Sequence, residues 1–151
     1  MTKVLVRLQP VASSSRYKFM KAILFLLLLI PAIVEGGELR GYLHTTSYHF
    51  NNGGYDFNNY NPGIALNYKL NYTFSVESGM YYNSFRETSV YGAISQKLDS
   101  ERWLEVGLMY GAVTGYFNRP VIPMAALYAE ISDVIRITLT PDPAIGVSFK
   151  Y

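Results

Sequence analysis

The sequence predicts an all-β protein, an eight-stranded antiparallel transmembrane β-barrel that follows a cleaved signal peptide. Three observations predict this fold class. After residue 36, runs of about ten residues alternate between apolar and polar side chains, as in strands with one apolar face. No stretch of that region keeps the 3.6-residue period of an amphipathic helix. Tyrosine is abundant (14 of 151 residues) and only 16% of residues are charged, which suits a surface with aromatic girdles.

Residues 1–36 have the pattern of a secretory signal peptide. Lys18 and Lys21 precede an apolar run over 22–30, and Val34-Glu35-Gly36 offers small residues for cleavage after Gly36. A membrane-anchoring helix is the alternative, but the apolar run is shorter than the ~20 residues that a spanning helix needs. Because the segment before Lys21 is long, Met20 is a second candidate for the start of the chain.

Residues 37–151 are predicted to form a single barrel domain. The leader holds five of the thirteen basic residues and one of the eleven acidic residues, which leaves eight against ten and a net charge of −2. The basic balance of the whole chain therefore belongs to the leader, and nucleic acid is not an expected partner. With no cysteine, the chain has no disulfide and no thiolate metal site.

Eight strands are predicted, over residues 38–50, 64–70, 72–82, 88–98, 103–115, 121–131, 134–140 and 145–151. In the first strand, Leu39 and Leu43 alternate with Arg40, Tyr42 and His44. Residues 51–63 are rich in Asn and Gly and end in Asn-Pro-Gly, so a long loop is expected there. The second strand turns near Asn71 into the third, whose aromatic and aliphatic side chains share one parity.

The second half of the chain continues the alternation after a loop at 83–86. A polar turn at 99–101 separates the fourth strand from the fifth, which is the clearest of all and places Gly107, Met109 and Gly111 on one face. A loop at 117–120 and a turn at 132–133 flank the sixth strand, and Pro141-Asp142-Pro143 precedes the last. Long and short connections thus alternate.

The charged residues of the strands favour a membrane barrel over a soluble one. Glu77, Glu105, Glu130, Arg136 and Lys150 all lie on the polar parity, opposite continuous aliphatic side chains. A lipocalin-like barrel normally turns its apolar face inward and its charges outward. A polar, ion-paired interior and an apolar exterior explain the pattern in a membrane barrel. The ending Gly-x-x-Phe-x-Tyr is also similar to the last strand of bacterial outer-membrane barrels.

A serine and a histidine are expected to meet at one rim. The strands that end at Phe50 and Ser84 run in the same direction with one strand between them, so their ends lie ~10 Å apart. Neutral imidazole can take a proton from a hydroxyl, which makes Ser84 and a histidine candidates for acyl transfer. His49 is nearest the rim, whereas His44 lies ~17 Å deeper. Strict parity turns His44 inward and His49 outward unless a bulge intervenes, and either histidine can instead be an ordinary hydrogen-bonded residue.

Several motifs together resemble the lipid A palmitoyltransferase (PagP-type) barrels over most of residues 38–151. They are a His followed by a long polar loop and Asn-Tyr-Asn-Pro-Gly-Ile-Ala-Leu, then Tyr-Tyr-Asn83-Ser84-Phe, Gly-Ala-Val-Thr-Gly-Tyr with Arg-Pro-Val-Ile-Pro-Met, and Thr-Leu-Thr-Pro. Members of that family move an acyl chain from a phospholipid to lipid A and need a His, an Asp and a Ser at the outer rim. The resemblance implies His49 as the base, Ser84 as the reacting hydroxyl and Asn83 as a polar orienter. Asn83 stands where the family has Asp, and an amide cannot supply a carboxylate charge.

The resemblance also implies a location and partners. The expected protein is a monomer in the bacterial outer membrane, with phospholipid and lipopolysaccharide as partners and no metal or soluble cofactor. Pro123 and Pro141 lie where the family uses prolines to open a lateral gap for lipids, although Pro120 and Pro143 suit ordinary turns. Met109 and its neighbouring glycines line an acyl pocket in this interpretation, or simply pack tightly in a narrow barrel.

Two other functions are considered beside acyl transfer. The first is a non-enzymatic surface or phage-conversion barrel that binds a partner with residues 51–63, and the Asn at position 83 favours it. The chain also resembles a broader set of small barrels of bacteria and phages that keep His-Phe, Asn-Pro-Gly and Asn-Ser-Phe. The second is a lipid A 3-O-deacylase, which needs a His-x-Ser on one strand that this chain does not have.

Overall fold

The structure of the protein, a computed structural model, describes residues 37–50, 54–116 and 119–151. The predicted signal peptide, the cleavage after Gly36 and the alternative start at Met20 lie outside the described residues. So do the first three residues of the predicted loop at 51–63 and two residues of the predicted loop at 117–120.

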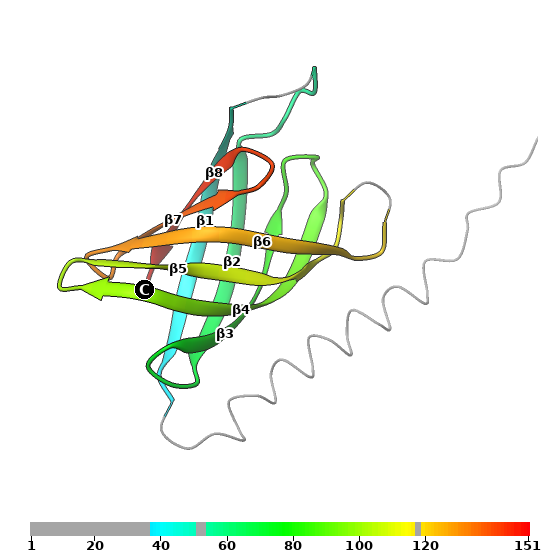
Figure 1. The fold of residues 1–151 in the computed structure, drawn as a ribbon. Helices are drawn as coiled ribbons and strands as arrows, with labels where there is room; N and C mark the ends of the chain where they lie inside the picture. Colours follow the sequence, from blue (N-terminus) through cyan, green and yellow to red (C-terminus); the bar gives the residue numbers. More distant parts are fainter. Residues whose placement is uncertain (1–36, 51–53, 117–118) are drawn as a thin grey trace, which may run out of the picture.

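The described chain is a closed antiparallel barrel of eight strands, as predicted (Figure 1). The strands are β1 (Leu39–His49), β2 (Tyr60–Lys69), β3 (Phe74–Tyr82), β4 (Thr88–Glu101), β5 (Leu104–Val113), β6 (Ile122–Ile131), β7 (Ile135–Thr140) and β8 (Ala144–Lys150). Each strand pairs with its neighbours in sequence, and β1 closes the barrel against β8. No helix long and apolar enough to cross a membrane occurs among the described residues.

Two predicted boundaries are wrong. Strand β2 begins at Tyr60, so the Asn-Pro-Gly sequence expected in a loop is strand, paired with β1. Pro62 is tolerated because this end of β2 pairs irregularly, beside a bulge in β1. Strand β4 continues to Glu101 through the turn predicted at 99–101, because Ser100 and Glu101 pair with the start of β5. Pairing with a neighbouring strand overrides local turn preference at both places.

The remaining tight turns follow local chemistry. Asn71 stabilises the β2–β3 turn through its Oδ1, which accepts hydrogen bonds from the backbone N–H groups of Thr73 and Phe74. In the β6–β7 connection, Ser132 and Asp133 have φ of 51° and 58°, a left-handed pair in a turn that is closed by a bond from Val134 N–H to the carbonyl of Ile131. These short connections fix the register of the strands that they join.

The barrel is apolar outside and polar inside. The large apolar side chains exposed on its strands are Leu39, Leu43, Tyr48, Tyr60, Ile64, Leu66, Met80, Tyr82, Ile94, Leu98, Leu108, Tyr110, Leu127, Leu139 and Phe149. The interior holds buried polar groups, among them Glu77, Glu130 and Arg136, as the parity of the charges predicts. The buried apolar side chains form one cluster inside the barrel, and the Arg136 guanidinium lies over two of its rings, those of Tyr42 and Tyr128.

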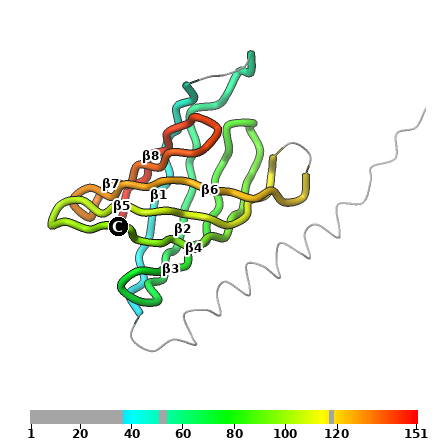
Figure 2. The backbone as a smooth tube through the Cα atoms, viewed as in Figure 1, coloured from blue at the N-terminus to red at the C-terminus, as the bar shows by residue number. Residues whose placement is uncertain are grey.

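The two ends of the barrel differ. Connections β1–β2, β3–β4, β5–β6 and β7–β8 share one end, here called the loop end, and the β1–β2 connection extends farthest from the strands (Figure 1). The short turns lie at the opposite end, here called the turn end. The C-terminus also lies there, where Tyr151 N–H donates to the carbonyl of Gly41 near the start of β1 (Figure 2).

Candidate active site

A bulge in β1 turns both histidines into the barrel. The register with β8 shifts between His44 and Thr46, which leaves Thr45 as an extra residue on β1. The register with β2 shifts at the same place, where Asn61 and Pro62 lie opposite Thr45. One added residue reverses the alternation beyond it, so His49 points inward although it differs in parity from His44. From the alternation of side chains alone, His49 can face the interior only if a bulge interrupts the first strand.

The structure brings His49 and Ser84 together at the loop end. His49 Nε2 lies 2.7 Å from Ser84 Oγ, within hydrogen-bond distance. Ser84 follows β3 and His49 ends β1, so the two strands reach the same rim on either side of β2. A nucleophile and a base at this separation have the geometry of a hydroxyl activated for acyl transfer.

A second serine helps to assign the proton of Ser84. Asn61 donates through Nδ2 to the carbonyls of Asn58 and Tyr82, so its Oδ1 faces Ser47 Oγ at 2.6 Å and accepts the Ser47 proton. Ser47 can therefore only accept from Ser84, and at 3.3 Å it is a poor acceptor. We therefore assign the Ser84 proton to the shorter contact, that with His49 Nε2. Nε2 is then the acceptor, so the proton of the neutral His49 ring lies on Nδ1.

Asn83 builds the turn that presents Ser84. Its Oδ1 accepts from the backbone N–H groups of Phe85 and Glu87, at 2.8 and 3.0 Å. Its Nδ2 donates to Ser89 Oγ at 2.9 Å and to the carbonyl of Gly115 at 2.7 Å. Within the described chain, none of its side-chain bonds reaches Ser84 or His49. Asn83, which was predicted to be a polar orienter, thus fixes the backbone of the turn that carries Ser84 rather than the imidazole of His49.

The amide at position 83 is required by its neighbours. Ser89 Oγ donates its proton to the carbonyl of Thr114, so toward Asn83 it can only accept, like the carbonyl of Gly115. A carboxylate would face two acceptors in a fully buried position. We expect Asn83→Asp to lower the free energy of unfolding by about 2–4 kcal/mol and to reduce any acyl transfer, measured by urea unfolding and by activity.

Asn59→Asp makes the same chemical change at an exposed loop position and serves as the matched control. A stability of Asn83→Asp equal to that of the control, or a gain in activity, would contradict the structural role of Asn83.

The β1–β2 connection adds residues that the sequence did not single out. Phe57 stacks on the His49 ring, and Asp56 pairs with Arg86, two residues beyond Ser84. The only signal in the sequence is that three aromatic residues interrupt an otherwise Asn- and Gly-rich loop over 51–63. On the other side of the site, the β7–β8 connection is tied to β1 by a bond from Phe50 N–H to the carbonyl of Pro143.

A large cavity inside the barrel lies next to the Ser84–His49 pair. Its volume is about 650 Å³, and His49 and Ser84 lie among its lining residues. Met109, Val113 and Ala126, all buried, form an apolar wall from β5 and β6. Met109 therefore lines the cavity, whereas Gly107 and Gly111, which were expected beside it, are not among the lining residues. A hydrocarbon chain in this space would replace unfavourable hydration of the wall with apolar contact.

The cavity extends sideways between β6 and β7. The ladder that joins these strands begins at Leu127 and Leu139, so the part of β6 nearest the loop end (122–126) has no register partner on β7. Pro123 and Ala125 are exposed on the outside yet also line the cavity. Pro141, which follows β7, lines it as well. The two prolines thus flank an unpaired stretch of the wall.

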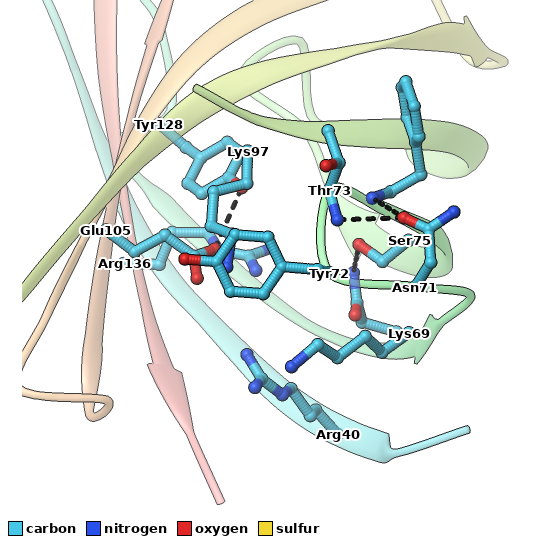
Figure 3. Close-up of a pocket in the computed structure, with 12 residues that line it drawn as sticks. Arg40, Lys69, Asn71, Tyr72, Thr73, Ser75, Lys97, Glu105, Tyr128 and Arg136 are labelled. Atoms are coloured by element: carbon cyan, nitrogen blue, oxygen red, sulfur yellow. Dashed lines mark hydrogen bonds between the residues drawn. The ribbon is translucent and has the colours of Figure 1, made fainter. Parts of the chain in front are cut away.

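Charged side chains close the cavity toward the turn end. Arg136 Nη1 lies 2.5 Å from Glu77 Oε2, and its Nη2 lies 3.0 Å from Glu130 Oε2, so one cation bridges two buried carboxylates. Below them, side chains that include Arg40 and Lys69 surround a space of only about 20 Å³ (Figure 3). The large cavity is thus separated from the turn end.

His44 belongs to this charged floor and not to the Ser84 pair. Its Nδ1 lies 2.8 Å from Ser148 Oγ, and its Nε2 lies 2.9 Å from the hydroxyl of Tyr91. Tyr91 donates in turn to Glu77, which fixes the ring from both sides. Among the described residues, no group of His, Asp or Glu side chains is arranged to hold a metal ion.

No protein-family model matches the chain, and no curated protein is similar to it at a significant level. The resemblance to lipid A palmitoyltransferases stays a prediction from the motifs, and the function rests on the geometry of the site.

Proposed function

We propose that the protein is an outer-membrane acyltransferase that moves an acyl chain from a phospholipid to lipid A at the loop end. The observation that carries the proposal is the Ser84–His49 pair, 2.7 Å apart at the mouth of an apolar cavity of about 650 Å³. The pair supplies a nucleophile and a base, and the cavity supplies a place for one hydrocarbon chain.

The exterior of the barrel supports a membrane location. Tyr48 and Tyr60 are exposed at the loop end, and Tyr72 and Trp103 are exposed at the turn end. Aliphatic side chains occupy the band between them. Two aromatic girdles around an apolar band are the surface that a bilayer requires of a transmembrane barrel. With the loop end outward, the site lies in the leaflet that holds lipid A.

The proposed reaction has two balanced steps. Ser84 Oγ attacks the ester carbonyl of a phospholipid while His49 Nε2 takes the hydroxyl proton, and the lysophospholipid leaves with that proton. A lipid A hydroxyl then attacks the acyl-serine, giving its proton through His49 back to Ser84.

The unpaired stretch between β6 and β7 gives the substrate a route. A phospholipid that diffuses in the bilayer can pass its acyl chain through the wall beside Pro123 without leaving the hydrocarbon layer. The charged floor beneath His44 stops the chain from reaching the turn end. The cavity therefore holds the acyl chain with its ester at Ser84.

Expression in a Gram-negative host tests the proposal. We expect the outer membrane to contain lipid A that is heavier by one acyl chain, seen by mass spectrometry, and we expect Ser84→Ala to produce none. Unchanged lipid A, with the folded barrel present in the outer membrane, would contradict the proposal.

Filling the cavity should separate chain binding from chemistry. Ala126 is buried on the cavity wall, so Ala126→Trp places a large ring where the acyl chain lies. We expect transfer of a long acyl chain to fall at least about tenfold, while cleavage of a short, water-soluble ester is retained. Equal losses for the long and the short ester would contradict the assignment of the cavity.

A non-enzymatic barrel is the second candidate, and the bonding of Asn83 favours it. The Asn83 amide is uncharged, and its oxygen and nitrogen are both bonded to groups of the turn and of neighbouring strands, so it supplies no charge to His49. A surface protein of this kind would bind its partner through the β1–β2 connection and would turn over no lipid.

A further inference from the structure

Residues 54–59 of the β1–β2 connection line the cavity and contact both members of the candidate pair. The Phe57 ring stacks on the His49 imidazole, with ring centroids 4.1 Å apart and planes inclined by 21°. Phe85, the residue after Ser84, makes an edge-to-face contact with Phe57, with ring centroids 5.3 Å apart and planes inclined by 86°. Phe57 therefore lies between the histidine side and the serine side of the site.

Three bonds fix this connection to the turn that carries Ser84. The backbone N–H of Asn58 donates to the carbonyl of Ser84 at 2.9 Å. Arg86 donates through Nη2 to the Asp56 carboxylate at 2.8 Å and through Nη1 to the Asp56 carbonyl at 3.0 Å. Residues on both sides of Phe57 are thus held by the β3–β4 connection, so the position of the ring is set by Ser84's own turn.

We propose that Phe57 is a positioning residue that holds the His49 imidazole with Nε2 directed at Ser84. The inference rests on the proposed function, in which that nitrogen takes the Ser84 proton. A histidine at the end of a strand can rotate about two side-chain bonds. The bond to Ser84, the one hydrogen bond of the His49 ring among the described residues, leaves the plane of the ring free to tilt. A ring stacked on one face restricts both rotations, and Phe85 and Asn58 keep that ring in place.

Removing the ring should slow the chemical step without weakening substrate binding. We expect Phe57→Leu to lower kcat about tenfold, the size of one lost ring contact, with KM changed less than twofold. Phe57→Trp restores a stacking ring and should recover more than half of kcat. Tyr48→Leu removes an exposed ring next to His49 that packs on Phe50 outside the barrel, and this matched control should keep kcat within about twofold.

A second readout does not depend on turnover. The chain has two histidines, so the ring ¹⁵N signals of His49 can be assigned by their loss in His49→Gln. We expect the wild type to show one tautomer, protonated on Nδ1, and Phe57→Leu to show exchange between tautomers. Should Phe57→Leu fail to fold, Arg86→Gln releases Asp56 while keeping every ring, and it should lower kcat about threefold.

The two readouts distinguish the possible failures. A wild-type barrel with the single His49 tautomer but no turnover would sink the proposed function and leave Phe57 as the positioning residue. An active wild type whose kcat and His49 signals are unchanged by Phe57→Leu, or by Arg86→Gln where Phe57→Leu does not fold, would overturn the inference alone. A fall in kcat that Phe57→Trp does not restore would also overturn it.

Discussion

Ser84→Ala is expected to abolish acyl transfer, with a loss of at least about 10³-fold in kcat/KM. The reason is that in the proposed reaction Ser84 Oγ forms the bond to the acyl carbonyl, and no other hydroxyl lies within 3 Å of His49 Nε2 among the described contacts. The measurement is transfer of a labelled acyl chain by the purified barrel in detergent micelles.

Matched histidine variants make this prediction specific. His49→Ala should lose activity to a similar extent, because the Ser84 proton then has no acceptor. His44→Ala should lose less than about tenfold, because His44 bonds to Ser148 and Tyr91 on the floor of the cavity. Activity that survives in His49→Ala but is lost in His44→Ala would reassign the base to the deeper histidine.

Arg136→Met is expected to lower the free energy of unfolding by about 3–5 kcal/mol. Arg136 is 4% exposed, and it bridges Glu77 and Glu130 while donating to the hydroxyl of Tyr42. Without the guanidinium, Glu130 keeps its ion pairs with Arg40 and Lys150, but the buried carboxylate of Glu77 has no cationic partner among the described residues. Urea unfolding followed by the fluorescence of Trp103, the only tryptophan of the chain, measures the change.

Two further variants test the cause of that loss. Arg102→Met removes an exposed arginine at the turn end and should change stability by less than about 0.5 kcal/mol. Adding Glu77→Gln to Arg136→Met removes the unpaired charge and should restore at least half of the loss. A double variant as unstable as Arg136→Met would contradict the account of the buried ion pairs.

The fold was predictable because every strand of such a barrel follows the same simple pattern of side chains. Inward and outward side chains alternate at period two, and the charges of Glu77, Glu130 and Arg136 share the inward parity. Those patterns are local and survive in one sequence. The start of β2 at Tyr60 was not predictable, since Asn-Pro-Gly favours a turn and becomes strand only through pairing with β1.

The site was predictable in part. The rim position of Ser84 and His49 follows from counting strands, but the bulge that turns His49 inward depends on the registers of β1 with two neighbours. The bonds of Asn83 reach Ser89 and Gly115, which approach it only in the folded barrel. Phe57 was missed because nothing in a loop sequence tells which ring will lie on the histidine.

Transfer of a labelled acyl chain from phospholipid to lipid A by the purified wild-type barrel tests the central claim most directly. Folding is verified first by the shift in gel mobility between unheated and heated samples. The account predicts that label leaves the phospholipid and appears on lipid A, with Ser84→Ala inactive in the same assay. A folded wild type that neither transfers nor hydrolyses the acyl chain would contradict it and leave a barrel that acts through its β1–β2 connection.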